Sequence, residues 1–569
     1  MNQQANVNDP MQEVGRLVQW GVHNLVNWQR SQNTAPIDYI QFNLPAQMPT
    51  MPDPRNIILQ RIQGKSAISL MEIEKAFQRI ALDNRPKGVL LYLQGAQMSL
   101  AELQMLRGSI KRLRESGKRV VCYAKSYDLR TYYVASAADE ILLQPGGDVS
   151  PIGLLMQQLF LKDSLQWAGI EVDVVAVTPY KSAMDQFSRT DPSEEVKEMM
   201  NWLLDSQYGQ IVSGIAAGRN ISEDDVRAMI DNAPYIDLMA LENGYIDGIT
   251  NEEGLRAHLD AKDIVLWDKA DGMIMEKWLN LMGKYVAVLH LEGSIVDGES
   301  ANPPVDVPVP LVGGPRIGDL TVVQQIRNLM HDERAAAVVV MVDSGGGSAS
   351  SSEAIASALG ELAKDRPVII YMHSVAASGG YYIATPADYI IAQPGTITGS
   401  IGVISGKFVT KGMYEKFNAH PFEYKRGQNA DIMAGTSNLT EEQREKMHQS
   451  IDRIYEQFLG RVADARKKKT AEIDAIGGGR VWTGEQAFEN GLVDELGGLF
   501  DAIAKAKEMA KLDEDAPAML VRSKPKPMPA QLAEQADPAA AIKYWLGGIN
   551  DLYGGRALLM MPYEITFKD

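Results

Sequence analysis

The sequence contains very little cysteine and histidine. Among its 569 residues there are one cysteine, Cys122, and seven histidines. A single cysteine excludes a disulfide within the chain and any zinc site built from several cysteines. The histidines are scattered, without the H-E-x-x-H spacing of a zinc peptidase. The sequence therefore favours neither a metal site nor a redox cofactor, and we expect no cofactor.

Long hydrophobic runs are also missing. The longest, residues 335–342, is flanked by Arg334 and Asp343 and is far shorter than the roughly 20 residues of a membrane-spanning helix, so we expect a buried strand there. The N-terminus lacks the basic and apolar regions of a secretory signal peptide. These absences predict a chain without a transmembrane segment or signal peptide, in a bacterial-type protein that is either membrane-associated or cytoplasmic.

Basic residues are fewer than acidic residues. Lys and Arg total 56, Asp and Glu total 73, and the net charge is −17. Such an acidic chain is poorly suited to neutralise phosphates, so no nucleic-acid partner is expected. Apolar residues make up 45% of the chain and charged residues 23%, a balance that excludes wholesale disorder. At roughly 150 residues per domain, the length suggests about four units or two large ones.

An amphipathic helix is predicted near the N-terminus, in residues 14–28. Its apolar residues recur at helical spacing on one face. Such a helix either docks on protein, in its own chain or a neighbour, or lies on a membrane surface. Only Arg16 and Arg30 are available there to attract anionic lipid. The residues of the apolar face are Val14, Leu17, Val18, Val22, Leu25 and Trp28.

The sequence contains an internal repeat. Residues 132–146 resemble residues 381–395, at an offset of 381 − 132 = 249, and residues 87–93 match residues 336–342 at the same offset. A repeat of this length predicts two copies of one domain. We expect an N-terminal arm with the amphipathic helix (1–52), an N-terminal repeat (53–250), a linker (251–283), a C-terminal repeat (284–512) and a C-terminal extension (513–569).

Strands and helices alternate within each copy. In the second copy, an apolar, β-rich run at 338–342 precedes a helical segment at 352–364, and further apolar runs follow at 367–372 and 389–392. This alternation predicts an α/β fold, with a mostly parallel sheet covered by helices. The first copy repeats the order at 89–93, 100–115, 119–123 and 140–143.

Two motifs of the second copy indicate a nucleophilic site. Consecutive strands end in Asp343-Ser-Gly-Gly-Gly-Ser348 and in Ala376-Ala-Ser-Gly-Gly-Tyr381. A serine at a strand-to-helix turn exposes its hydroxyl, and nearby glycine N–H groups can bind a developing oxyanion. Either motif alone fits an N-cap or a tight turn, but together they favour Ser378 as nucleophile. The first copy has Leu129 at that position (378 − 249 = 129) and cannot supply this nucleophile.

The base for Ser378 is predicted to be a lysine. His373 stands five residues before Ser378, roughly 15 Å back along an extended strand, so we expect a buried packing role for it. Lys181 follows an apolar strand at 172–177, where desolvation would leave a neutral amine. The second copy has Ala430 at that position (181 + 249 = 430). Because each copy lacks what the other keeps, one Ser–Lys site assembled from both copies is indicated.

These motifs resemble signal peptide peptidase A, the long, duplicated protease IV type of peptidase family S49. The resemblance covers about residues 55–510. Two departures stand out: Asp343 and Gly345 replace the usual Asn and Pro of the glycine loop, and the usual N-terminal membrane anchor is absent. The most specific elements are Tyr180-Lys-Ser182, Asp343-Ser-Gly-Gly-Gly347, Ala377-Ser-Gly-Gly-Tyr381 and Thr398-Gly-Ser-Ile-Gly402.

The resemblance implies a serine endopeptidase with a Ser–Lys dyad that cleaves remnant signal peptides or similar hydrophobic peptides. It implies two tandem ClpP/crotonase-like domains of the ββα-superhelix type. It also implies a homo-oligomer, with a tetramer as the form expected for this type, and residues 14–28 offer a peripheral membrane contact. The implied roles are Ser378 as nucleophile, Lys181 as general base, Ser400 as the residue that orients the lysine, and Gly346, Gly347 and Gly379 as the oxyanion hole.

Three alternatives stay open. Without the membrane anchor, the chain fits a cytosolic or peripheral peptidase for other peptides. A non-catalytic scaffold or a crotonase-type acyl-thioester enzyme would use the same oxyanion hole without Ser378 and Lys181. A ClpP-like Ser–His–Asp peptidase is disfavoured, because no histidine fits the helix expected after the nucleophile. The sequence also leaves open whether the Ser–Lys pair forms within one chain or between neighbours.

Overall fold

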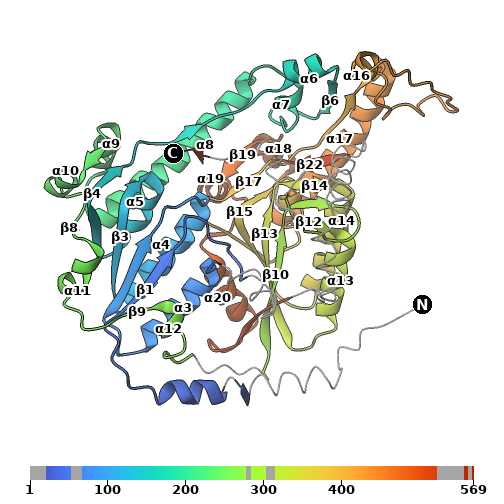
Figure 1. Cartoon of the computed structure of the whole chain (residues 1–569). Helices are drawn as coiled ribbons and strands as arrows, with labels where there is room; N and C mark the ends of the chain where they lie inside the picture. The colour runs from blue at the N-terminus through green and yellow to red at the C-terminus, as the bar shows by residue number, and fades with distance from the viewer. Residues whose placement is uncertain are drawn as a thin grey trace. The chain divides into compact units, whose positions relative to one another are not determined.

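The structure is a computed structural model, and it describes residues 21–52 without 23, 67–276, 283–302, 314–521, 557–561 and 567–568 (Figure 1). Residues 14–20 and 23 of the predicted N-terminal helix lie outside these ranges. The chain divides into two compact units: Met1–Leu155, Asp205–Met282 and Phe567–Asp569 form the first, and Met156–Leu204 and Gly283–Thr566 form the second. Residues 156–204, which the repeat assigns to the first copy, therefore fold with the second copy.

A mostly parallel sheet forms the centre of the first unit. Its strand order is β7-β4-β3-β2-β1-β9, with β8 beside β4. Side-chain caps at Ser69 and Ser99 begin the helices α3 and α4 that lie between its strands in sequence. The central elements are β1 (Tyr39–Leu44), α3 (Leu70–Leu82), β2 (Gly88–Leu93), α4 (Leu100–Glu115), β3 (Arg119–Asp128), α5 (Leu129–Ala135) and β4 (Glu140–Ser150).

Part of the segment expected as a linker belongs to this first sheet. The strand β9 (Ile264–Leu266) pairs in parallel with β1, and the ring of Trp267 stacks on that of Phe42 with centroids 5.1 Å apart. The opposite edge of the sheet consists of β7 (Tyr235–Ile236), and β8 (Gly248–Ile249) lies beside β4.

The second unit is built on a larger sheet with the order β19-β17-β15-β13-β10-β21. Its central strand β13 (Ala335–Ser344) contains the longest apolar run of the sequence, and residues 337–342 are fully buried, which confirms the buried strand predicted there. The helices α13 (Asp319–Met330) and α14 (Ala349–Ala363) lie side by side against this unit (Figure 1). The parallel neighbours of β13 are β10 (Tyr285–Glu292) and β15 (Val368–Ala377), and β15 in turn pairs in parallel with β16 (Tyr389–Ala392) and β17 (Ile397–Gly399).

A second sheet of the same unit joins segments far apart in sequence. Its order is β12-β11-β14-β22-β18-β6. The strand β6 (Glu171–Ala176) runs antiparallel to β18 (Ile404–Val409), and it immediately precedes the segment with Lys181. The strand β22 (Leu558–Met560), near the C-terminus, lies between β18 and β14 (Gly346–Ser348). Among the described helices, none combines the length and the apolar character needed to cross a bilayer.

Candidate active site

Ser378 lies at a sharp turn between β15 and the short helix α15 (Gly379–Tyr382). Its φ of 56° and ψ of −113° are unusual for a residue with a side chain, and strain of this kind concentrates at functional sites. The Ser378 N–H donates to the Gly399 carbonyl at 2.8 Å, and the Ser378 carbonyl accepts from the Tyr382 N–H at 2.8 Å. These bonds fix the turn and thereby the direction of the fully buried hydroxyl.

Lys181 meets this hydroxyl inside the second unit. Its Nζ lies 2.7 Å from Ser378 Oγ, and it donates to the Ser400 carbonyl at 2.8 Å and to Ser400 Oγ at 2.9 Å. The side chain is 1% exposed, and these three partners are uncharged oxygen atoms. Burial lowers the pKa of Lys181 well below its ordinary value, because the charged form loses its water.

Ser400 is held so that two of its oxygen atoms face the lysine. It follows β17 with a positive φ of 51°, and its N–H donates to the Arg480 carbonyl at 2.6 Å. In this conformation both the hydroxyl and the carbonyl of Ser400 reach Lys181. The turn in Thr398-Gly-Ser-Ile-Gly402 is therefore what lets one residue contribute two contacts.

The three glycines predicted for the oxyanion hole lie beside Ser378. A β-carbon at Gly346, where φ is +102°, would lie 1.9 Å from the Leu559 carbonyl oxygen and 2.7 Å from the Gly379 nitrogen. A β-carbon at Gly379 would lie 3.2 Å from the Gly347 nitrogen. Only glycine fits where backbones approach this closely. The Gly346 N–H already donates to Ser344 Oγ at 3.1 Å.

Sequence reasoning missed the residues that enclose the lysine. A β-carbon at Gly479, where φ is +88°, would lie 2.6 Å from the Lys181 nitrogen, and one at Gly402 would lie 3.2 Å from its Cδ. Ser344, which holds the Gly346 N–H, also donates to the Gly293 carbonyl at 2.6 Å. The sequence feature that could have indicated Gly479 is the run of three glycines at 477–479.

An apolar cluster adjoins Ser378 and Lys181. Trp202 stacks on Trp482 with ring centroids 4.8 Å apart, and its indole N–H donates to the Val481 carbonyl at 2.9 Å. Tyr180, next to Lys181, packs against the same cluster. The buried members are Met199, Leu203, Ala377, Ile397, Val481 and Met561.

His373 takes no part in this arrangement. It lies in β15, is buried as expected, and its Nδ1 is 3.3 Å from the Tyr371 hydroxyl. The side-chain contact described for Ser378 Oγ is with Lys181.

Comparison with known proteins agrees with these features. A family model described as "Peptidase family S49" matches residues 112–265 and 361–513. The two matches begin 361 − 112 = 249 residues apart, which is the offset of the internal repeat.

The chain belongs to peptidase family S49.

Curated relatives of this S49 peptidase match along most of its length. It is 31% identical over 517 residues to "Serine protease SPPA, chloroplastic" of Arabidopsis thaliana, covering 89% of this chain and 73% of that protein. It is 32% identical over 473 residues to "Protease 4" of Haemophilus influenzae, covering 79% and 74%. Among solved structures, a mutant form of the "1510-N membrane-bound stomatin-specific protease" aligns over 42% of this chain and 99% of that chain, with 16% identity and a TM-score of 0.27.

The predicted fold class and the resemblance to signal peptide peptidase A are confirmed. The family model matches twice, and each of the two units contains a mostly parallel sheet with helices in βαβ order, as two tandem ClpP/crotonase-like domains from a duplication require. The S49 peptidase is accordingly a member of a family of serine proteases.

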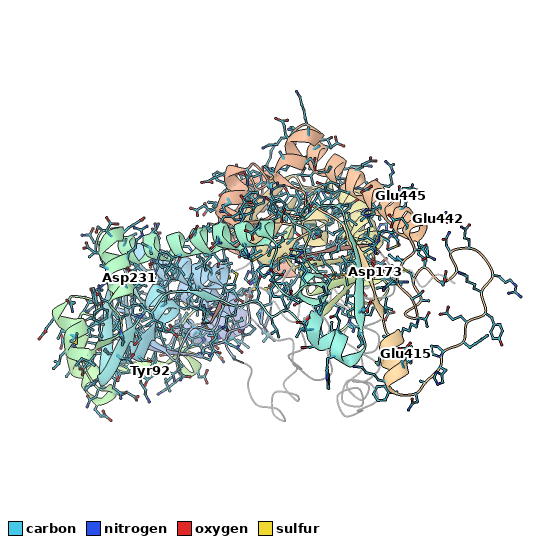
Figure 2. All side chains as sticks on the ribbon, turned by 90° about the horizontal axis from the view of Figure 1, so that it is seen from above. Tyr92, Asp173, Asp231, Glu415, Glu442 and Glu445 are labelled. Carbon is cyan, nitrogen blue, oxygen red and sulfur yellow. The ribbon has the colours of Figure 1, made fainter. Side chains whose placement is uncertain are left out.

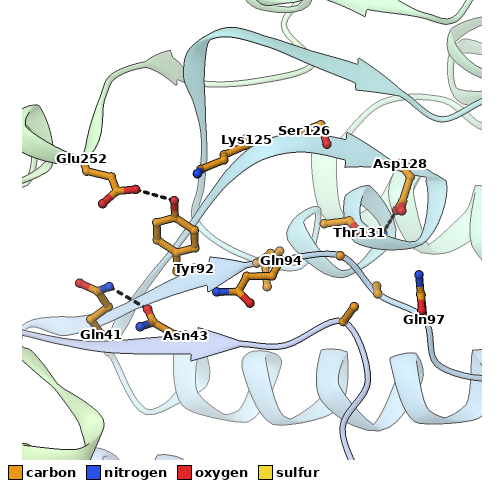
Figure 3. Close-up of a pocket in the computed structure, with 14 residues that line it drawn as sticks. Gln41, Asn43, Tyr92, Gln94, Gln97, Lys125, Ser126, Asp128, Thr131 and Glu252 are labelled. Atoms are coloured by element: carbon orange, nitrogen blue, oxygen red, sulfur yellow. Dashed lines mark hydrogen bonds between the residues drawn. The ribbon is translucent and has the colours of Figure 1, made fainter.

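The first copy of the S49 repeat contains a polar cavity where its strands end. The cavity has a volume of about 600 Å³ and is lined from β1, β2, β3 and the loop at 94–97 (Figure 3). Within it, the Tyr92 hydroxyl donates to Glu252 at 2.6 Å. In this copy the residue equivalent to Ser378 is Leu129, which is buried. This copy therefore presents no equivalent nucleophile at the cavity.

Proposed function

We propose that this S49 peptidase hydrolyses peptide bonds with a Ser378–Lys181 dyad. The 2.7 Å separation of Lys181 Nζ and Ser378 Oγ, in a buried site where the lysine pKa is lowered, carries the proposal. Neutral Lys181 accepts the Ser378 proton as Oγ attacks the carbonyl carbon. The amine then protonates the leaving nitrogen, and water hydrolyses the acyl-enzyme with the lysine again as base.

Backbone N–H groups stabilise the oxyanion in this proposal. The Gly379 N–H follows the nucleophile directly, and the closeness of Gly347 to it supports these two as donors. Gly346 is the third candidate, and its N–H would have to leave Ser344 Oγ to act. Ser400 positions the lysine through its hydroxyl and carbonyl.

Hydrophobic peptides, including remnant signal peptides, are the proposed substrates. The chain's own segment 558–560 supports this, because it lies extended and antiparallel to the glycine strand, with Leu559 opposite Gly347 and Met560 opposite Gly346. The Met561 N–H donates to the Gly345 carbonyl at 2.7 Å, and Met561 belongs to the apolar cluster. A substrate would bind in the same way, by adding a strand with apolar side chains.

The test is a comparison of full-length chains with a serine-directed fluorophosphonate and an apolar fluorogenic peptide. Ser378→Ala and Lys181→Met are expected to lose labelling and at least about 10³-fold in kcat/KM. Lys407→Met is a matched control, because Lys407 is another buried lysine of the same unit, where its Nζ donates to the carbonyls of Ile432 and Ala434. Its activity is expected to stay near wild type.

Undiminished cleavage in either dyad variant would overturn the dyad. Wild-type protein that binds acyl thioesters and leaves Ser378 unlabelled would instead support the crotonase-type alternative.

We also propose a peripheral membrane contact through the N-terminal helix and assembly into a homo-oligomer. Residues 24–31 are helical. Asn27 is buried and exchanges two hydrogen bonds, of 2.9 and 2.8 Å, with the backbone of Glu276, whereas Leu25 and Trp28 are each 57% exposed. An apolar face turned outward supports contact with lipid. Trp28→Asp is therefore expected to reduce the fraction of protein that floats with phospholipid vesicles. Unchanged flotation would contradict the membrane contact. The tetramer stays a prediction.

A further inference from the structure

The polar cavity of the first copy lies where the second copy has the two loops of the candidate active site. Its lining residues all belong to the first compact unit, and Figure 2 shows one of them, Tyr92, in that unit. The strand β3 ends at Asp128, and its equivalent β15 ends at Ala377 (377 − 128 = 249). By the same offset, the cavity loop at 94–97 corresponds to residues 343–346 of the glycine loop. The cavity is therefore the counterpart of the candidate active site.

Two walls of this cavity stand farther apart than their counterparts do. In the second copy, a β-carbon at Gly380 would lie 2.4 Å from the Ser344 carbonyl oxygen, so only glycine fits there. The first copy has Thr131 at this position (380 − 249 = 131). A loop that approached α5 as closely as the glycine loop approaches α15 would collide with the Thr131 side chain. The wider spacing leaves the volume of about 600 Å³.

Thr131 brings a buried hydroxyl without a partner to the cavity. The residue lines the cavity and is 1% exposed, and its Oγ1 has no hydrogen-bond partner among the described residues. Its backbone N–H, in contrast, donates to Asp128 Oδ1 at 2.7 Å (Figure 3). A buried polar group without a partner destabilises the folded chain, and a ligand that supplies the missing hydrogen bond removes this cost. The hydroxyl therefore points to a polar ligand.

Four side-chain carboxamides line the same cavity. Gln94 and Gln97 come from the loop that carries glycines in the second copy; both are exposed, and neither side chain has a hydrogen-bond partner in the described part of the chain. Gln41 and Asn43 lie in β1, where the Gln41 Nε2 donates to Asn43 Oδ1 at 2.8 Å. A carboxamide offers two donors and an acceptor, which match a peptide group or another carboxamide.

The charges of the lining favour an uncharged ligand. The cavity has one lysine, Lys125, and two carboxylates, those of Asp128 and Glu252. An anion such as a phosphate or a carboxylate would meet more negative than positive charge there. An apolar ligand would leave the polar groups of the lining without hydrogen-bond partners. A neutral ligand with both donors and acceptors avoids both costs.

We propose that the first copy uses this cavity to bind, without cleaving it, a peptide with uncharged polar side chains. The second copy favours a peptide as the ligand, because its equivalent loop already holds an extended segment, residues 558–560. In the first copy the N–H groups of Gln94 and Gln97 donate to the carbonyls of Leu44 and Ala46, at 3.1 and 2.7 Å. Since these backbone donors are engaged, the carboxamides and the Thr131 hydroxyl make the contacts.

Fluorescence anisotropy tests the binding. The probe is a short, labelled, end-blocked peptide of Asn, Gln and Ser, added to the full-length Ser378→Ala chain. Saturable binding is expected, and the double variant Gln94→Leu with Gln97→Leu should bind at least about tenfold more weakly. Gln166→Leu, at an exposed glutamine outside the cavity, should bind like its parent chain. Mass spectrometry of the probe reports any cleavage, so a failure of the proposed dyad is seen separately from a failure to bind.

The Thr131 hydroxyl permits a second test. Thr131→Val keeps the shape of the side chain and removes a hydroxyl that makes no described hydrogen bond. We expect weaker binding of the probe and a melting temperature of the free chain that is not lowered. Thr131→Ser keeps the hydroxyl and is expected to retain binding.

Two results would overturn the proposal. One is a polar peptide that does not bind saturably, or that binds equally well to the double variant and to Thr131→Val. The other is a neutral oligosaccharide that binds in a Gln94-dependent way while the peptide does not, which would assign the cavity to a sugar.

Discussion

Lys181 Nζ lies 2.7 Å from Ser378 Oγ, although 197 positions separate the two residues in the sequence. Both belong to the second compact unit, because residues 156–204 fold with residues 283–566. The pairing of β6 with β18 brings the lysine segment to this unit. The pair therefore meets within one chain, a question that the sequence left open.

The pH dependence of the proposed activity follows from the buried lysine. Burial lowers the pKa of Lys181, and only the neutral amine can accept the Ser378 proton. We expect kcat/KM to fall as the pH decreases through this lowered pKa and to level off above it. The measurement is kcat/KM for an apolar peptide across the pH range in which the protein stays folded. A flat profile across that range would contradict a lysine base.

The same lysine is expected to make stability depend on pH. Its pKa is lower in the folded chain than the 10.5 of an ordinary lysine, so the unfolded chain binds more protons between the two values. Stability therefore falls as the pH decreases from 10.5 to the folded-state pKa and is constant below it. We expect Lys181→Met to raise the midpoint of thermal unfolding at neutral pH and to flatten its pH dependence. Lys364→Met, at an exposed lysine, should change neither.

Ser400 is expected to act as a positioning residue. Ser400→Ala removes the 2.9 Å contact with Lys181 Nζ but keeps the 2.8 Å contact through the carbonyl. We expect a loss of about 10²-fold in kcat/KM together with a shifted pH profile. Ser405→Ala is the matched control, because the Ser405 hydroxyl is buried without a described partner. An unshifted profile in Ser400→Ala would leave it with a structural role alone.

The glycine packed against Lys181 offers a further test. Gly479→Ala brings a β-carbon to 2.6 Å from the Lys181 nitrogen, so the lysine segment must move. Gly244→Ala carries a similar positive-φ strain, of about 1–2 kcal/mol, but has no atom within 4 Å of the new carbon. We expect both variants to lose some thermal stability and only Gly479→Ala to lose activity, by about 10²-fold or more. Equal activities would show that the lysine position tolerates displacement.

The strand β22 (Leu558–Met560) is expected to restrict access of substrate to Ser378. Its Leu559 and Met560 lie opposite Gly347 and Gly346, where the proposed substrate strand would bind. A chain that ends at Val521 should therefore react faster with a fluorophosphonate than the full chain. Thermal unfolding of both chains controls for loss of structure. Equal labelling rates, with unfolding unchanged, would show that β22 does not compete with substrate.

Local order was predictable from the sequence, because it depends on neighbouring residues. The helix expected at 100–115 is α4, and the strand expected at 389–392 is β16. The repeat, and the reciprocal loss of serine in one copy and lysine in the other, predict Ser378 and Lys181 as partners from the sequence alone. These features depend on periodicity, turn residues and self-similarity, all of which can be recognised in the sequence.

The relations between distant segments, in contrast, follow only from tertiary packing. Packing places residues 156–204 in the second unit and pairs β6 with β18. It also brings Gly479 against Lys181, and it lets the Gly346 N–H donate to Ser344 Oγ. No local pattern encodes which surfaces of two similar domains will meet, because both copies carry the same periodicity. That choice depends on side-chain volume and burial summed over the whole unit. The residue types of the proposed site can therefore be predicted along the chain, whereas their contacts depend on the folded unit.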